Sequence, residues 1–134
     1  MRIAIVGASK PTFNEERDAQ QFCGLMMNQW IKEFDNLEIV SGGAKGIDTV
    51  AVDTARGLGI KCKVFVPEVP NWEGYKARNL KIAEYCDQIY CLPASLKKTK
   101  CYHCNEPHER SGGCWTAKKV KEMGKLSRVI PPTR

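Results

Sequence analysis

Apolar residues in this chain form short runs that alternate with stretches of helical spacing. The runs at 2–9, 37–41, 61–67, 88–94 and 127–130 predict β-strands. The segments between them carry apolar side chains three or four positions apart, which predicts helices. Because the two patterns alternate, we expect an α/β, Rossmann-like three-layer sandwich. Helices would cover both faces of a parallel sheet of about five strands.

The longest predicted helix follows the segment PTF at 11–13. Thr12 and Glu15 fit a capping box at its start, although Asn14 is a rival cap. Its apolar positions repeat every three or four residues and predict one buried stripe. They are Ala19, Phe22, Cys23, Met26, Met27, Trp30, Ile31 and Phe34.

A chain of 134 residues favours one domain, which we place at 1–134 with a Cys/His-rich insert at about 96–114. No apolar run approaches the ~20 residues that span a bilayer. The first residues, MRIAIVGASK, read as a strand and lack the pattern of a signal peptide. These features predict a cytoplasmic protein without membrane contact.

The net charge of +6 favours anionic partners such as nucleotides or nucleic acid. A basic, solvated surface is the alternative explanation of the same charge.

Glycine-rich loops follow two of the predicted strands, and a third precedes the last predicted helix, at 114–125. They are GASK at 7–10, SGGAKGID at 41–48 and SGG at 111–113. In an open parallel sheet, ligands bind outside the carboxyl ends of the strands, where all three loops are expected. We therefore predict that the loops converge on one ligand.

The residue types in these loops suit a phosphate-bearing ligand. A glycine loop that opens a helix presents backbone N–H groups, and the helix dipole adds partial positive charge. Lys10 and Lys45 add charge, and Asp48 can accept from a sugar hydroxyl or cap its own helix. The predicted contacts are Gly7, Ala8, Ser9, Lys10, Ser41, Gly42, Gly43, Lys45, Gly46, Asp48, Ser111, Gly112, Gly113 and Thr116.

The alternative is that these glycines serve only the geometry of tight turns. None of the loops has the Walker A pattern or the dinucleotide-binding G-x-G-x-x-G pattern.

Four segments, IVGAS, IVSGGAKGIDTVAVDTA, ARN and SGGCWTAKKVKEMGK, resemble the SLOG superfamily. That group includes the DNA-processing protein DprA, the LOG enzymes and the YspA/YpsA-like proteins. The segments GYKARN and CDQIYCLP are most similar to the YspA/YpsA-like branch. The resemblance implies a Rossmann-like fold that binds nucleotide-derived ligands, with Arg78 and Asn79 pointing into the ligand cleft. The resemblance also makes a homo-oligomer a hypothesis, because family members commonly self-associate.

The resemblance also brings alternatives. LOG enzymes carry the pattern PGGxGTxxE with a catalytic glutamate, whereas SGGCWTAKK has Trp115 and lysines in that region. A nucleotide-binding sensor or sequestering protein is therefore favoured over a nucleotide N-glycosidase (phosphoribohydrolase), and catalytic residues stay unassigned. A third hypothesis, from the likeness to DprA, is single-stranded nucleic-acid binding, with Tyr102 and Trp115 stacking on bases.

The insert contains a CCHC set that predicts structural zinc. Cys101, Cys104, His108 and Cys114 fall within fourteen residues, close to zinc-knuckle spacing, and can complete a tetrahedron. Free thiols in a loop, or a reactive Cys114 at a helix start, are the alternatives. If zinc holds Cys114, it also fixes the neighbouring SGG loop.

Overall fold

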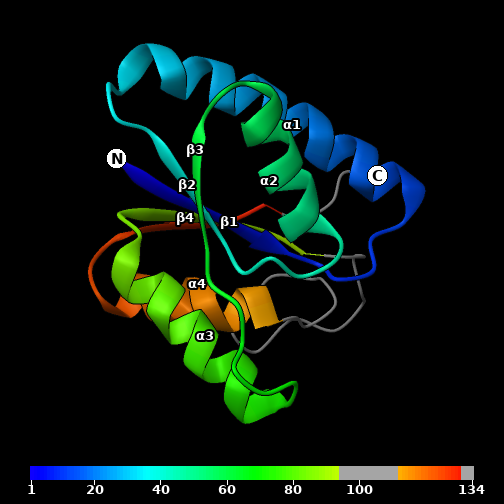
Figure 1. Cartoon of the computed structure of the whole chain (residues 1–134), viewed down its shortest axis with the longest axis vertical. Coiled ribbons are helices and arrows are strands. Elements are labelled where there is room, and N and C mark those ends of the chain that lie inside the picture. Colours follow the sequence, from blue (N-terminus) through cyan, green and yellow to red (C-terminus); the bar gives the residue numbers. More distant parts are fainter. Residues whose placement is uncertain (94–111, 131–134) are drawn as a thin grey trace.

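In the computed structural model, which describes residues 1–93 and 112–130, a five-stranded sheet is sandwiched between two pairs of helices (Figure 1). The strands are β1 (Arg2–Gly7), β2 (Glu38–Ser41), β3 (Lys61–Val64), β4 (Gln88–Leu92) and β5 (Leu126–Val129). The helices are α1 (Phe13–Glu33), α2 (Ile47–Gly57), α3 (Trp72–Tyr85) and α4 (Gly112–Glu122). The predicted α/β class is confirmed.

All strand pairs are parallel, and their order across the sheet is β3-β2-β1-β4-β5. The chain moves outward from β1 to β3 and then crosses back to β4, on the other side of β1. The direction of winding therefore reverses between β1 and β4, where Gly7 pairs with Leu92. Such a reversal opens a crevice at the carboxyl ends of the two strands.

The alternation of side chains along β1 gives each face of the sheet its own core. Ile3 and Ile5 pack with α1 and α2, whereas Ala4 and Val6 pack with α3 and α4. Successive strand residues point to opposite faces, so a strand covered on both sides needs an unbroken apolar run. The run RIAIVG meets that need.

Helix α1 begins and packs as its sequence predicts. Thr12 Oγ1 accepts from the Glu15 N–H at 3.2 Å, and Glu15 Oε1 accepts from the Thr12 N–H at 2.8 Å. This reciprocal pair satisfies two N–H groups that the first turn leaves unpaired. The buried members of its stripe are Ala19, Cys23, Met27 and Trp30. Within the described residues, no helix combines the length and hydrophobicity that crossing a bilayer needs.

Several boundaries differ from the sequence prediction by one to three residues, among them the end of β3 and the start of α4. Strand β3 stops at Val64, although Phe65 N–H still donates to Ser41 O at 2.9 Å. Helix α4 begins at Gly112 rather than Cys114, so Gly112 and Gly113 form its first turn instead of a preceding loop. Glycine is a poor helix former, which is why the pair reads as loop in the sequence.

Candidate ligand-binding cleft

The three predicted glycine segments lie around one cleft of about 690 Å³ at the carboxyl edge of the sheet. The end of β1 and the loop after it contribute one wall, and the loop after β2 with the start of α2 contributes the second. The segment after β3 and the first halves of α3 and α4 form the rest. Its lining residues are Val6, Gly7, Ser9, Gly42, Gly43, Ala44, Lys45, Asp48, Val66, Pro67, Trp72, Tyr75, Arg78, Asn79, Gly113 and Thr116. Most of the residues predicted from the sequence are therefore neighbours in space.

Because Gly7 and Gly46 have no side chains, the first two loops can pack closely against neighbouring backbone atoms. A Cβ at Gly7 would lie 2.2 Å from Leu92 O, and one at Gly46 would lie 2.3 Å from Ala8 O. Gly46 also has φ +84°, a conformation that residues with side chains rarely adopt. Ala8 is buried, and its carbonyl accepts from the Ile47 N–H at 3.0 Å. Ala8 and Gly46 thus hold the loops together rather than line the cleft.

The loop after β2 is shaped by its own hydrogen bonds. Ser41 is fully buried, and its Oγ accepts from the Gly43 N–H at 3.1 Å. Thr49 Oγ1 donates to Ala44 O at 2.8 Å. Gly43 has φ +68°, which lets the chain turn toward α2. Ser41 therefore stabilises the loop through this buried hydrogen bond and does not line the cleft.

Asp48 lies in the first turn of α2 with its carboxylate at the inner end of the cleft. The residue is 6% exposed. Burial raises the pKa of its carboxyl from the ordinary 3.8 to about 6, while Arg78 and the backbone amides of Ala44, Gly42 and Gly7 act to lower it. The net pKa is raised because desolvation destabilises the charged carboxylate more than these groups stabilise it.

Arg78 and Asn79 enter the cleft from α3. Arg78 Nη1 donates to Gly42 O at 2.6 Å, and its Nε donates to Asn79 Oδ1 at 2.8 Å. Asn79 is buried, and the Arg78 guanidinium lies 5.8 Å from the centre of the Tyr75 ring. Burial lowers the pKa of Arg78, and the charge of Asp48 raises it in return. The guanidinium is thus held in one orientation across the cleft.

Aromatic side chains form the outer part of the cleft. Trp72 and Tyr75 line it and are 48% and 38% exposed. Trp72 meets Trp115 of α4 edge to face, with ring centroids 5.9 Å apart. Exposed aromatic faces beside a polar interior suit a ligand with a flat ring. Tyr75 and the apolar pair Val66 and Pro67 were not predicted; the spacing of Tyr75, one turn before Arg78, was the available signal.

The third segment reaches the cleft through Gly113 and Thr116, both buried. A Cβ at Gly113 would lie 3.1 Å from the Gly7 N atom and 3.1 Å from Cys91 Sγ. The start of α4 therefore packs directly on the end of β1. Lys45 lines the cleft and is exposed, whereas Lys10 is exposed and does not line it. Ser111 lies outside the described residues.

The predicted zinc ligands Cys101, Cys104 and His108 also lie outside the described residues, so zinc stays a prediction. Cys114 is fully buried in α4, in one apolar cluster with Cys91, Ala117 and Val120. Within the described ranges 1–93 and 112–130, no three metal-ligating side chains gather at one place.

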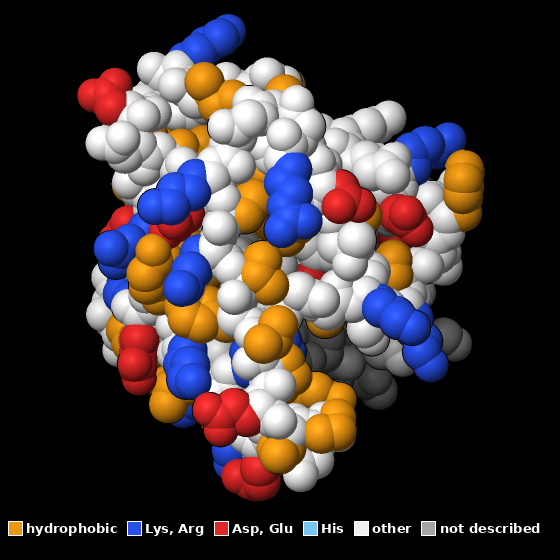
Figure 2. Space-filling view, viewed as in Figure 1, with side chains coloured by type: hydrophobic (Ala, Val, Ile, Leu, Met, Phe, Trp, Pro, Cys, Tyr) orange, Lys and Arg blue, Asp and Glu red, His pale blue; other side chains and the backbone are white. Residues whose placement is uncertain are grey.

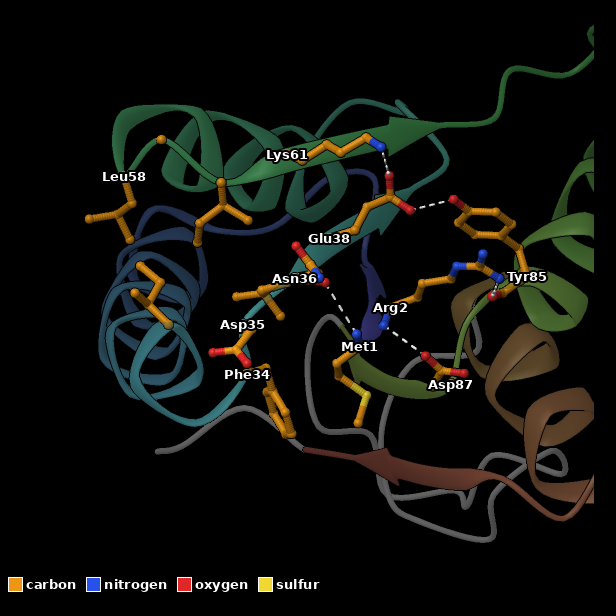
Figure 3. Close-up of a pocket in the computed structure, with 14 residues that line it drawn as sticks. Met1, Arg2, Phe34, Asp35, Asn36, Glu38, Leu58, Lys61, Tyr85 and Asp87 are labelled. Carbon is orange, nitrogen blue, oxygen red and sulfur yellow. Dashed lines mark hydrogen bonds and ion pairs between the residues drawn. The ribbon is translucent and has the colours of Figure 1, made fainter.

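A second cavity, of about 640 Å³, lies at the opposite edge of the sheet and is called here the amino-edge cavity (Figure 3). Its buried Glu38 carboxylate lies 3.5 Å from Lys61 Nζ and accepts a short hydrogen bond from the Tyr85 hydroxyl. The Arg2 guanidinium stacks 4.1 Å above the Tyr85 ring. Figure 3 shows these groups pointing toward one another. Because the cavity's central polar groups satisfy each other, we place the candidate site at the carboxyl edge instead.

The fold and cleft define a Rossmann-like protein with a candidate ligand site at the winding reversal of its sheet. DprA from Streptococcus pneumoniae superposes with a TM-score of 0.70 at 22% identity, over 97% of this chain and 49% of that chain. DprA from Helicobacter pylori, described for its single-stranded DNA binding mode, gives 0.69 at 18% identity, over 100% and 66%. This chain thus spans about half the length of the S. pneumoniae protein.

Other structures share the arrangement. The molybdenum cofactor carrier protein from Chlamydomonas reinhardtii gives a TM-score of 0.64 at 13% identity, over 97% of this chain and 74% of that chain. The protein TM1055 gives 0.63 at 14% identity, over 92% and 70%. No protein-family model matches the sequence, and comparison with curated proteins gives no match. The similarity therefore establishes a DprA-like, Rossmann-type fold.

Proposed function

We propose that the carboxyl-edge cleft binds a nucleotide or a nucleotide-derived ligand, as a sensor or sequestering protein would. The observation that carries the proposal is the convergence of three glycine segments, Arg78 and two exposed aromatic rings on one cleft of about 690 Å³. That volume suits a small ligand, since ligand pockets usually measure about 300–1,000 Å³. A planar guanidinium suits a phosphate, and aromatic rings suit a base.

The sequence resemblance to the YspA/YpsA-like branch of the SLOG superfamily supports the same proposal. So does the fold shared with H. pylori DprA, which binds single-stranded DNA, and with a carrier protein of the molybdenum cofactor. The first two sources point to nucleotides or nucleic acid, and the third shows the same fold in a protein that carries a small cofactor.

Isothermal titration calorimetry with nucleosides, nucleoside monophosphates and inorganic phosphate tests the proposal. We expect at least one base-containing probe to bind more tightly than phosphate alone, because both the rings and the guanidinium would contact it. Arg78→Ala should weaken that binding, whereas Lys81→Ala, at an exposed lysine of α3 that does not line the cleft, should leave it unchanged. If no probe of the panel binds, or if both variants bind alike, the proposal is wrong.

Single-stranded nucleic acid is a second candidate ligand. Its support is the net charge of +6, the exposed Trp72 and the fold shared with DprA. On the face shown in Figure 2, however, Lys and Arg are scattered among acidic and apolar side chains rather than gathered in one stripe. Binding of a labelled single-stranded oligonucleotide that falls steeply with salt would favour this candidate, because phosphate contacts release counterions.

Hydrolysis of a nucleotide remains the alternative activity. Among the described lining residues, Asp48 is the one carboxylate, and α4 carries lysines one turn beyond Gly113. Incubation with nucleoside monophosphates and chromatography for free base separates binding from hydrolysis. Binding without release of base is the expected result.

A further inference from the structure

The sequence predicts that backbone amides of the glycine loops bind a phosphate. The carboxylate of Asp48 lies among these amides in the structure. The amides of Gly7, Gly42 and Ala44, called here the amide cradle, come from both glycine loops and stabilise the ionised Asp48. The residue is 6% exposed and lines the inner end of the cleft. The amides that could bind a phosphate thus already act on a carboxylate of the chain itself.

The space beside Gly42, which a side chain would fill, is occupied by two side chains of the protein itself. A Cβ there would lie 2.7 Å from Arg78 Nη1 and 2.9 Å from Asp48 Oδ2. The space is taken by the chain's own guanidinium and carboxylate, and Arg78 is further fixed by its bond to Gly42 O. Gly42 is therefore required by the chain's own side chains, whichever group of a ligand lies beside it.

An anion in the cradle changes which ligand group can lie there. A phosphate beside an ionised carboxylate is repelled, because two negative charges at close range inside a protein are screened less than they are in water. A hydroxyl or amino group, in contrast, can donate to the carboxylate. Hydrogen bonds to a charged acceptor are stronger than those to a neutral one.

We propose that ionised Asp48 is a built-in anion that fills the amide cradle, so that the inner end of the cleft takes neutral hydrogen-bond donors, such as sugar hydroxyls, and excludes phosphate. This inference rests on the proposed function, since it assigns which part of a nucleotide-type ligand points inward. A phosphate is then left to the outer cleft, where Arg78 has N–H groups beyond its two bonds and Lys45 is exposed.

The surroundings of Asp48 make its charge sensitive to pH near neutrality. Among the described lining residues, the charged or titratable groups are Arg78 and Tyr75 from α3 and Lys45 from the loop after β2. The loop after β1 contributes Ser9, and α4 contributes Thr116. With a pKa of about 6, Asp48 is largely ionised at pH 8 and largely protonated at pH 5. Binding of a neutral donor should therefore strengthen as pH rises through about 6.

Adenosine, which carries no phosphate, and sulfate, which does not titrate in this range, are the probes. In the unmodified protein we expect adenosine to bind more tightly at about pH 8 than at about pH 5. Asp48→Asn, which keeps the shape but not the charge, should weaken adenosine binding at the higher pH by about tenfold and remove the pH dependence. Asp53→Asn, on the exposed side of α2, is the control and should bind adenosine like the unmodified protein.

Sulfate tests the exclusion of anions, with the backbone amide signals of Gly7, Gly42 and Ala44 followed by NMR. The Gly7 signal decides, because Gly42 and Ala44 adjoin Arg78 and Lys45, where the outer cleft is expected to hold an anion. At the higher pH, sulfate should leave the Gly7 signal unmoved in the unmodified protein and shift it in Asp48→Ala. A sulfate-dependent shift of the Gly7 signal in the unmodified protein at that pH would overturn the inference even if neither variant folds. If AMP binds but Asp48→Asn changes neither adenosine affinity nor its pH dependence, the inference fails and the proposed function stands. If neither adenosine nor AMP binds any form, the proposed function itself fails.

Discussion

Trp72 of α3 and Trp115 of α4 meet edge to face, with ring centroids 5.9 Å apart and planes at 81°. Such a pair is a favoured arrangement of aromatic rings, because the positive edge of one faces the negative face of the other. It joins the starts of two helices at the cleft and leaves Trp72 48% exposed. Trp72 is therefore both supported by a neighbour and available to a ligand.

Trp72→Ala should weaken binding of a nucleoside by about 1–3 kcal/mol, the usual contribution of one base–aromatic stack. Calorimetry with adenosine measures the change. Phe13→Ala is the matched control, because Phe13 is 80% exposed and does not line the cleft. Equal losses in the two variants, or none in either, would contradict a stacking role for Trp72.

Arg78→Lys should weaken nucleotide binding even though the positive charge is kept. A lysine cannot reproduce the planar fork that bonds Gly42 O and Asn79 Oδ1 together. Removing the charge altogether, in Arg78→Ala, should raise the pKa of Asp48 above about 6, because Arg78 acts to lower it. NMR titration of the Asp48 side-chain carbonyl measures this shift, and a fall in the pKa would contradict the arrangement described.

Two glycine substitutions test the loop geometry through stability. Gly46→Ala should destabilise the protein by at least about 2 kcal/mol, because φ is +84° and the new Cβ would meet Ala8 O. Gly24→Ala lies within α1 with nothing near the new Cβ, so it should stabilise by roughly 0.5–1 kcal/mol. Urea unfolding followed by circular dichroism measures both. A neutral Gly46→Ala would show that the contact between the first two loops differs from that described.

The zinc prediction is tested by metal analysis of the purified protein. We expect about one zinc per chain, lost in Cys104→Ser and after treatment with a chelator. Cys62→Ser is the control, since Cys62 lies in β3 and belongs to the packing of the sheet. If zinc also fixes the start of α4, its removal should weaken nucleotide binding. Zinc-free protein with all four ligand residues intact would contradict the prediction.

The type and order of the helices and strands could be predicted from the sequence, because each element has its own local pattern of apolar and polar residues. The unbroken apolar run of β1 predicts a strand buried on both faces, and the Thr12–Glu15 pair predicts where α1 starts. The start of α4 was missed, because the helix there is held by packing of Gly113 on Gly7 rather than by helix propensity.

The site was predictable in its parts but not in its arrangement. Glycine loops at strand ends indicate a carboxyl-edge site, and family resemblance brought in Arg78 and Asn79. That Arg78 reaches Gly42, 36 positions away, and that Asp48 lies beside Gly42 in the same cleft, depend on how α2 and α3 pack on the sheet. No local pattern encodes such contacts, and the sequence therefore suggested an empty phosphate site.

The most direct test of the central claim is a ¹H–¹⁵N NMR titration of the protein with AMP. A ligand in the carboxyl-edge cleft should shift the amides of Gly7, Gly42, Gly43 and Gly113 and leave those around the amino-edge cavity, at Glu38 and Lys61, unmoved. Shifts confined to Glu38, Lys61 and Tyr85, or no shifts at all, would contradict it.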